Sequence, residues 1–300
     1  MLFICRLLSR LPLIVLHTVG SRAGWIAYLF SSVYRHHFAE NWLRWQNWHG
    51  QHPELSPSGV SNQARRAAIA TSGQLAMELP KTWLRPPEEL RRLIVDVQGQ
   101  QHIEEALQDG KGVLLLTPHI GNFELIALHI GMHYPITSLF RPARQEFLRK
   151  LMYMGRNQGR AKTSPADISG VRAMLKALKN NQIIGMLPDQ TPQVGEGQWA
   201  NFFGHPAWTM TLAARLSIAA GATLLALCER LPRSTGYRIQ FSPPREELFG
   251  ETAERVQQIN NELEQVIAQL PCQYLWGYNR YKRPRGVPLP PAKIMSANTS

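Results

Sequence analysis

The sequence predicts an α/β protein with a mainly parallel central sheet, covered by helices on both faces and preceded by an N-terminal helical membrane-attachment segment. After Gly110, apolar runs of four to six residues alternate with helical stretches, which is typical of strands buried on both faces. Hydrophobic residues make up 44% of the 300 residues, enough for a sizeable core. We expect membrane-associated helices over residues 1–50, the α/β domain over 51–290 and a flexible tail over 291–300.

The N-terminal segment is apolar but interrupted. Residues 11–21 and 23–34 contain no Lys, Arg, Asp or Glu, and Arg22 lies between them. A membrane-spanning helix needs about 20 mostly apolar residues, and an arginine at its centre costs about 3 kcal/mol. We therefore expect a single span or helices lying in the interface, with two buried helices of a soluble domain as the alternative. Trp42, Trp45 and Trp48 form a stripe that fits core packing and interface anchoring equally well.

The elements after residue 62 follow from hydrophobic periodicity and from Pro and Gly breaks. A helix over 63–84 ends before Pro86-Pro87, and short helices over 88–93 and 103–108 flank a strand over 94–97. Asn122 is expected to cap the helix over 123–133. The remaining strands are expected over 113–117, 136–140, 183–187, 223–227 and 237–241, and the remaining helices over 170–179, 209–220 and 251–269.

The charge is strongly basic, with 33 Lys and Arg against 21 Asp and Glu and a formal net charge of +12. Such a chain attracts nucleic acids, acidic proteins, anionic lipids or phosphorylated substrates. No recognised nucleic-acid-binding motif accompanies the charge, although duplex binding with a steep salt dependence would support that function. Cys5, Cys228 and Cys272 are far apart and predict neither a disulfide framework nor a cysteine zinc site.

The stretch TPHIGNFEL places His119 and Glu124 directly behind an apolar strand. If one helix carried both residues, five steps of about 100° would leave the two side chains about 140° apart, on different faces. The spacing therefore indicates that the helix begins between them. His119 then lies at the carboxyl end of a strand, where open α/β sheets bind ligands. With Glu124 orienting one ring nitrogen, the other can take a proton from a hydroxyl group. No serine nucleophile accompanies this pair, so acyl transfer to a substrate alcohol is the predicted chemistry, and a loop facing water is the alternative.

Further motifs resemble a known family. The block PHIGNFE is similar to the HX4(D/E) motif of the glycerolipid acyltransferase superfamily, and SLFRP, GMLPDQ and LLAL follow where that family has its later blocks. The stretches MLPDQTPQVGEGQWANFFGHPAWTMTLAARLS and QYLWGYNRYKRP resemble the late lipid A acyltransferases of Gram-negative bacteria. Pro118 before the histidine, Glu124 in place of Asp, and PDQTP in place of EGTR all favour this branch.

The resemblance implies transfer of a lauroyl or myristoyl chain from acyl carrier protein to a hydroxyacyl chain of a Kdo-bearing lipid A precursor. It implies lipopolysaccharide biosynthesis at the bacterial inner membrane, with the catalytic domain on the cytoplasmic side. No metal and no cofactor is expected, because acyl carrier protein brings the acyl group as a co-substrate, and no nucleic acid is expected as a partner.

The candidate site residues come from the strand ends and from a basic run over 141–162. Arginine forks match phosphate oxygens, so this run is a candidate phosphate clamp, although a solvated basic face explains most of it equally well. Backbone amides near Gly121 and Asn122, or Arg141, are the candidate donors to the oxyanion. Asp189 and Gln190 follow a strand end, and a turn aspartate is the alternative for Asp189. The predicted catalytic residues are His119 and Glu124, and the predicted substrate-binding residues are Asn122, Arg141, Arg160, Asp189 and Gln190.

Three rival functions remain at this point, of which a basic nucleic-acid-binding protein is one. A thioesterase-type hydrolase would use the same pair of side chains on water, and would consume the acyl donor without an acceptor. An acyltransferase acting on another membrane lipid would share the motif but take a different acceptor.

Overall fold

The computed structural model describes residues 2–55, 61–143 and 145–295. Four long N-terminal helices open the chain: α1 (Leu2–Arg10), α2 (Leu13–Phe30), α3 (Ser32–Gln51) and α4 (Asn62–Leu84). Ser31 caps α3 by accepting from the backbone N of Tyr34, and Ser61 caps α4 by accepting from that of Ala64. The part of the expected flexible tail over 296–300, and Arg144 of the basic run, lie outside the described residues.

The main sheet confirms the expected fold class. Its strands are β1 (Ile94–Gln98), β2 (Val113–Leu116), β3 (Ile136–Phe140), β4 (Ala161–Pro165), β5 (Ile183–Met186), β8 (Ala222–Arg230) and β9 (Tyr237–Ser242). Within the described residues these seven strands lie in the order β1-β9-β8-β2-β5-β3-β4. The strands from β8 to β4 run parallel, whereas β9 is antiparallel to β8 and parallel to β1. A separate antiparallel hairpin consists of β6 (Gly197–Phe202) and β7 (His205–Met210).

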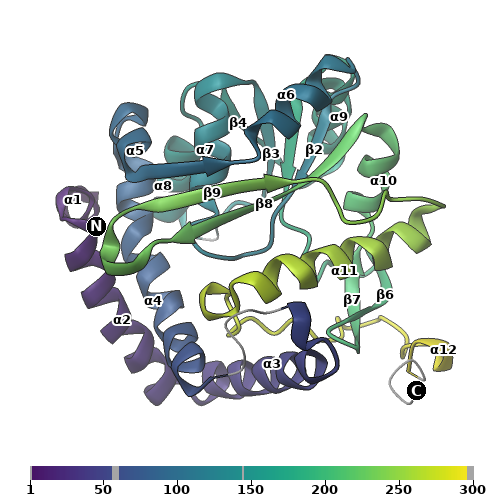
Figure 1. Cartoon of the computed structure of the whole chain (residues 1–300), viewed down its shortest axis with the longest axis horizontal. Coiled ribbons are helices and arrows are strands. Elements are labelled where there is room, and N and C mark those ends of the chain that lie inside the picture. Colours follow the sequence, from purple (N-terminus) through teal and green to yellow (C-terminus); the bar gives the residue numbers. More distant parts are fainter. Residues whose placement is uncertain (1, 56–60, 144, 296–300) are drawn as a thin grey trace.

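Helices cover both faces of the sheet (Figure 1). All four residues of β2 are buried, with Val113 and Leu115 in one hydrophobic core and Leu114 and Leu116 in a second. This alternation follows from the two-residue period of a strand. The remaining helices are α5 (Pro87–Leu93), α6 (Gln100–Gln108), α7 (Glu124–His133), α8 (Glu146–Arg156), α9 (Ile168–Lys179), α10 (Leu212–Ala219), α11 (Thr252–Gln269) and α12 (Ala292–Met295), with short 3₁₀ turns at Pro53–Leu55, Pro232–Ser234 and Pro271–Gln273.

Several elements differ from the sequence-based expectation. Helix α8, strand β4 and the β6–β7 hairpin were not expected. The helix expected over 209–220 begins at Leu212, because Thr209 and Met210 pair with β6 as the end of β7. The other expected strands and helices after residue 62 are present, with ends shifted by a few residues.

Helix α2 packs closely along α4 (Figure 1). Gly20 and Gly24 face Gly73, and a Cβ added to Gly73 would lie 2.1 Å from the carbonyl oxygen of Gly20. These glycines let the two backbones come together where larger side chains would separate them. Leu13 and Leu16 on the same face of α2 are buried in the core that contains Val113 and Leu115.

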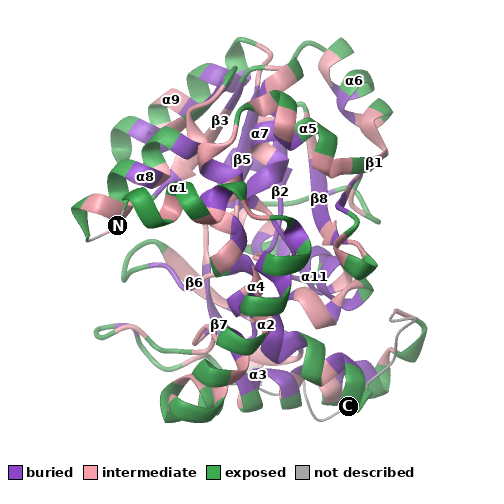
Figure 2. Ribbon diagram, turned by 90° about the vertical axis from the view of Figure 1, so that its left-hand side faces the viewer, coloured by how far each residue is buried: buried purple, intermediate pink, exposed green. Residues whose placement is uncertain are grey.

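The outer face of α2 consists of exposed residues (Figure 2). Ile14, Ile26, Leu29 and Phe30 are all at least half exposed. Within the described residues, α2 is the one helix that is long and apolar enough to cross a membrane by length and composition, with a mean hydropathy of 1.3. This helix therefore has one face docked on the protein and another that is apolar and uncovered.

The tryptophan stripe on α3 is part of the core. Trp42 is 2% exposed, Trp45 is fully buried and Trp48 is 9% exposed. Trp42 and Trp45 both pack against the ring of Trp276 from the C-terminal region. The structure therefore favours the core-packing interpretation of this stripe over interface anchoring.

Candidate active site

Two neighbouring parallel strands bring the candidate catalytic residues together. In the register of β2 and β5, Leu116 lies opposite Met186. His119 follows the first strand by three residues, and Asp189 follows the second by three residues. Equal distances beyond paired strand ends place the two side chains next to each other at the carboxyl edge of the sheet, where α/β proteins bind ligands.

Asp189 is the hydrogen-bond partner of the His119 ring. Nδ1 of His119 lies 2.7 Å from Oδ1 of Asp189, and the backbone N of His119 donates to Oδ2 at 3.0 Å. The hydroxyl of Tyr274 also donates to Oδ2, at 3.1 Å. Three donors therefore surround a carboxylate that is only 1% exposed.

These contacts keep Asp189 ionised and fix the tautomer of His119. Burial alone would raise the pKa of Asp189, but the charge and hydrogen bonds of His119, with the charge of Arg280, lower it below the usual value. An ionised carboxylate requires a proton on Nδ1, which leaves Nε2 with its lone pair. The amide Nε2 of Gln190 lies 3.1 Å from Nε2 of His119. His119 is thus arranged to accept a proton at Nε2.

Glu124 is engaged elsewhere, which corrects the expectation that it orients His119. Its Oε2 accepts from Nε1 of Trp83 at 3.1 Å and from Nε of Arg156 at 2.8 Å, and its Oε1 contacts Nη2 of Arg156. Burial would lower the pKa of Arg156, but the neighbouring Glu124 carboxylate raises it. Glu124 opens α7 and points towards α4 and α8, whose side chains already occupy both of its oxygens.

The turn after His119 packs directly against the backbone of neighbouring segments. Gly121 has a φ of +57°, and a Cβ there would lie 1.6 Å from the carbonyl oxygen of Cys228. The backbone N of Gly121 donates to the carbonyl of Gln273, and that of Asn122 donates to the carbonyl of Cys228. Both amides are therefore occupied, so they do not serve as the expected oxyanion donors.

Asn122 has a structural position. It is fully buried, and its side-chain amide donates to Oγ1 of Thr82 at 3.0 Å. The first residue of α7 is Glu124 and the residue before it is Phe123, so Asn122 is not the expected helix cap. The expectation that Asn122 contacts substrate is also corrected, because its buried side chain links the turn to α4.

A pocket of about 480 Å³ opens in front of His119. Apolar side chains form much of its wall, and three cations, Arg141, Arg156 and Lys282, also line it. Gln190 and Glu124 reach this pocket as well. Arg160 does not: it lies in a second pocket beside α5 and α7, where its Nη1 donates to the carbonyl of His133.

The sequence reasoning missed two residues of this site. Arg156 was only one of several basic residues in the run over 141–162, and Tyr274 belongs to the stretch QYLWGYNRYKRP, which had no assigned role. The available signal for Asp189 was its position three residues beyond a buried strand, which matches that of His119.

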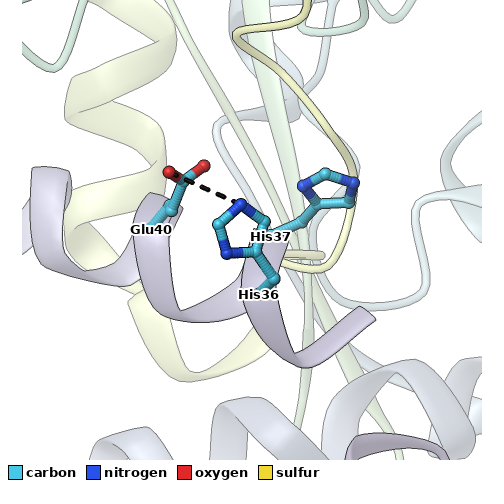
Figure 3. Close-up of side chains that lie close together, drawn as sticks. All are labelled: His36, His37 and Glu40. Atoms are coloured by element: carbon cyan, nitrogen blue, oxygen red, sulfur yellow. Dashed lines mark ion pairs between the residues drawn. The ribbon is translucent and has the colours of Figure 1, made fainter. Parts of the chain in front are cut away.

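One group among the described residues has a composition suited to a metal ion. His36, His37 and Glu40 on α3 place one ligand atom each within 4.8 Å of one another (Figure 3). None of the three lines the pocket of His119. His36 and Glu40 are four residues apart on one helix face, and an ordinary surface ion pair accounts for their contact of 3.6 Å.

Comparison with known proteins decides the family. The family model described as "Bacterial lipid A biosynthesis acyltransferase" matches residues 1–283. The chain belongs to this family. It is 29% identical over 243 residues to a lipid A biosynthesis lauroyltransferase of Escherichia coli, covering 78% of each chain. It is 27% identical over 221 residues to a lipid A biosynthesis palmitoleoyltransferase of the same organism, covering 71% of this chain and 70% of the relative.

A third relative, a lipid A biosynthesis acyltransferase of Haemophilus influenzae, is 25% identical over 182 residues, covering 59% of this chain and 56% of that protein. The chain is thus an enzyme, an O-acyltransferase of lipid A biosynthesis. An O-acyltransferase needs a group that accepts the proton of an alcohol, and His119 with its buried carboxylate has the required arrangement.

Proposed function

We propose that the enzyme transfers a lauroyl or myristoyl chain from acyl carrier protein to a hydroxyacyl chain of a Kdo-bearing lipid A precursor, with His119 as general base. The observation that carries this proposal is the contact of 2.7 Å between His119 Nδ1 and Asp189 Oδ1 at the wall of a partly apolar pocket. The donor and the myristoyl chain rest on the family resemblance alone, whereas the lauroyl chain also appears in the name of one relative.

In this mechanism, Nε2 of His119 removes the proton from the acceptor hydroxyl as its oxygen attacks the thioester carbonyl. Asp189 holds the ring and stabilises the imidazolium that forms. The carbon–sulfur bond then breaks, and the thiolate of the carrier takes the proton from the imidazolium. The amide of Gln190 must leave Nε2 when the hydroxyl arrives, because one lone pair cannot serve both.

Charge complementarity supports the choice of acceptor. Arg156 is already paired with Glu124, so Arg141 and Lys282 are the pocket cations available to the phosphates that a lipid A precursor carries. Because the backbone amides of Gly121 and Asn122 are occupied, these cations are also the remaining candidates to stabilise the oxyanion.

We further propose that α1 and α2 attach the enzyme to the inner membrane by lying in its interface, with the catalytic domain on the cytoplasmic side. One face of α2 is held by α4 along the helix, while Ile14, Ile26, Leu29 and Phe30 face outwards. Phe3 of α1 is also 79% exposed. A helix docked in this way inserts one apolar face and keeps the other on the protein.

The direct test uses purified enzyme with lauroyl and myristoyl thioesters of acyl carrier protein and a Kdo-bearing tetraacyl precursor. Mass spectrometry of the product should show the added chain, and His119→Ala should abolish it while the fold survives. Turnover in folded His119→Ala would end the assignment of the base. Donor consumption without an acceptor would favour a thioesterase, and product formed only with another membrane lipid would change the acceptor.

A further inference from the structure

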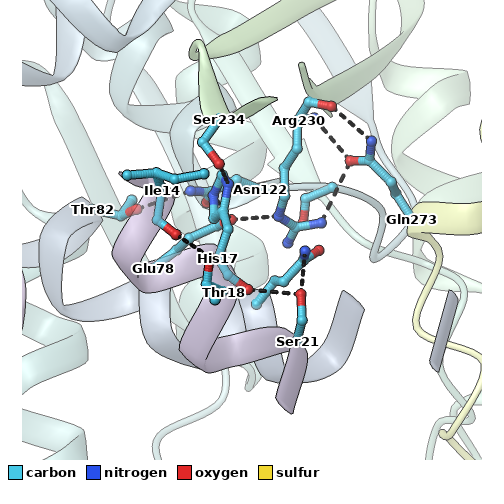
Figure 4. Close-up of polar contacts among 12 residues, drawn as sticks. Ile14, His17, Thr18, Ser21, Glu78, Thr82, Asn122, Arg230, Ser234 and Gln273 are labelled. Carbon is cyan, nitrogen blue, oxygen red and sulfur yellow. Dashed lines mark hydrogen bonds and ion pairs between the residues drawn. The ribbon is translucent and has the colours of Figure 1, made fainter. Parts of the chain in front are cut away.

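A buried polar cluster that contains an ion pair lies behind the turn that carries His119. It joins His17 of α2, Glu78 of α4 and Arg230 at the end of β8 (Figure 4). Glu78 is fully buried, and the other two are each 6% exposed. Oε1 of Glu78 lies 2.6 Å from Nε2 of His17 and 2.5 Å from Nε of Arg230.

The cluster reaches the catalytic turn through Arg230. Its Nη2 donates to the carbonyl of Gly121 at 3.0 Å, two residues after His119. Gln273 reinforces the same turn, since its side chain bonds both the backbone N and the carbonyl of Arg230, while its own carbonyl accepts from the backbone N of Gly121. One guanidinium therefore ties the turn to α4, and Glu78 ties that guanidinium to α2.

Stability alone is a weak reason for such a cluster. Burying charged groups carries a desolvation penalty that a well-packed apolar set of similar volume would avoid. What an apolar set would not supply is a fixed donor to the carbonyl of Gly121. That carbonyl belongs to a residue with a φ of +57°, in a turn whose neighbours leave no room for a Cβ.

We propose that His17, Glu78 and Arg230 are positioning residues, through which the seating of α2 on α4 sets the geometry of the turn that carries His119. The inference rests on the proposed role of His119 as general base. His17 is held from both sides, because its Nδ1 lies 2.8 Å from Oγ of Ser234 in the β8–β9 connection. The helix that faces the membrane thus contributes a side chain to the support of the catalytic centre, although it does not touch substrate.

The experiment compares His17→Leu, which removes the ring nitrogens, with His17→Gln, whose amide nitrogen can still reach Glu78. His17→Leu should lower kcat of the folded enzyme by about tenfold to a hundredfold, the scale expected for a displaced catalytic group, and leave KM for both substrates within about twofold. His17→Gln should restore most of kcat. Glu78→Gln removes the charge that holds Arg230 and should lower kcat in the same way as His17→Leu. Its matched control is Glu262→Gln, which should leave kcat at the wild-type value, because Glu262 on α11 is also buried (8% exposed) but accepts from the backbone N of Arg245, away from the turn.

A purely structural cluster gives a different result. His17→Leu would then lower the midpoint of chemical unfolding and leave kcat of the folded enzyme at the wild-type value, which would overturn the proposal. If His17→Leu does not fold, Arg230→Lys decides in the same way, since lysine can pair with Glu78 or reach Gly121 but does not span both. His119→Ala measured in parallel separates the two failures: turnover in that variant refutes the proposed base, whereas an inactive His119→Ala with wild-type kcat in folded His17→Leu refutes only the positioning role.

Discussion

Replacing Asp189 with asparagine should change the tautomer of His119 without changing the shape of the site. Oδ2 accepts from the backbone N of His119 at 3.0 Å and from the hydroxyl of Tyr274 at 3.1 Å, whereas Oδ1 faces Nδ1 of His119 at 2.7 Å. The backbone N–H has no lone pair to offer, so the asparagine oxygen must take the place of Oδ2. Its NH₂ group then faces Nδ1, which becomes an acceptor, and the ring proton moves to Nε2.

The expected loss of kcat follows from the relative energies of the two His119 tautomers. The flipped amide would leave a buried donor facing another donor, which costs about 1–3 kcal/mol, so the wrong tautomer should dominate. The carboxylate that stabilises the imidazolium is also lost. The same substitution in a serine protease triad lowers kcat about 10⁴-fold. We expect Asp189→Asn to lower kcat by about 10³- to 10⁴-fold, equivalent to about 4–5.5 kcal/mol in the barrier.

The assay is acyl transfer at saturating donor and acceptor, with unfolding curves to show that each variant is folded. Tyr274→Phe is the matched control: it removes one donor to Oδ2 and leaves the carboxylate, so kcat should stay within about tenfold of wild type. A folded Asp189→Asn enzyme that keeps more than a tenth of wild-type kcat would refute the assignment of Asp189 as the partner of His119.

Three further predictions concern stability, membrane attachment and the turn. Burial raises the pKa of Glu264 from 4.5 to about 8, so its contribution to stability is fully present below pH 4.5 and is lost as the pH rises to about 8. Glu264→Gln should therefore have little effect near pH 4.5 and stabilise by up to about 3 kcal/mol at pH 7 in chemical denaturation, at about 1.4 kcal/mol per pH unit. Ile26→Asp with Phe30→Asp should weaken binding to anionic vesicles in a flotation assay while leaving the fold intact, because both side chains are exposed. Gly121→Ala should abolish acyl transfer and destabilise the fold, since its Cβ would lie 1.6 Å from the carbonyl oxygen of Cys228.

Each of these has a clear contrary result. A pH-independent effect of Glu264→Gln would mean that the carboxyl is ionised in the fold. Unchanged flotation of the double variant would mean that α2 is not the part of the enzyme that contacts the membrane. Wild-type activity in Gly121→Ala would mean that the turn has room which the structure does not show.

The sequence was sufficient for the strand that carries His119, because an apolar run followed by Pro, Gly and Asn marks a buried strand and its exit turn. It was insufficient for the partner of His119. Asp189 follows β5, which lies directly beside β2, although β3 and β4 come between them in the chain. Strand order is set by long-range packing rather than by local pattern, so a carboxylate five residues away in sequence was preferred to one seventy residues away.

Arg156 illustrates a second limit. Its segment was interpreted as a basic run, and the amphipathic helix α8 that carries it was not expected. Only the fold shows that this arginine turns inwards to Glu124 while Arg160 lies in a different pocket. The charge of a segment is visible in sequence, but the direction of each side chain depends on the element that holds it.

The close seating of α2 on α4 bears on how a water-soluble form of this enzyme could be made. Deleting the first thirty residues would strip Leu13 and Leu16 from the core and remove His17 from its buried contacts. The backbone of α4 around Gly73, which Gly20 and Gly24 now cover, would be left open to water. Exchanging outward side chains such as Ile26 and Leu29 for polar ones keeps the helix in place, and is the gentler route to a detergent-free preparation.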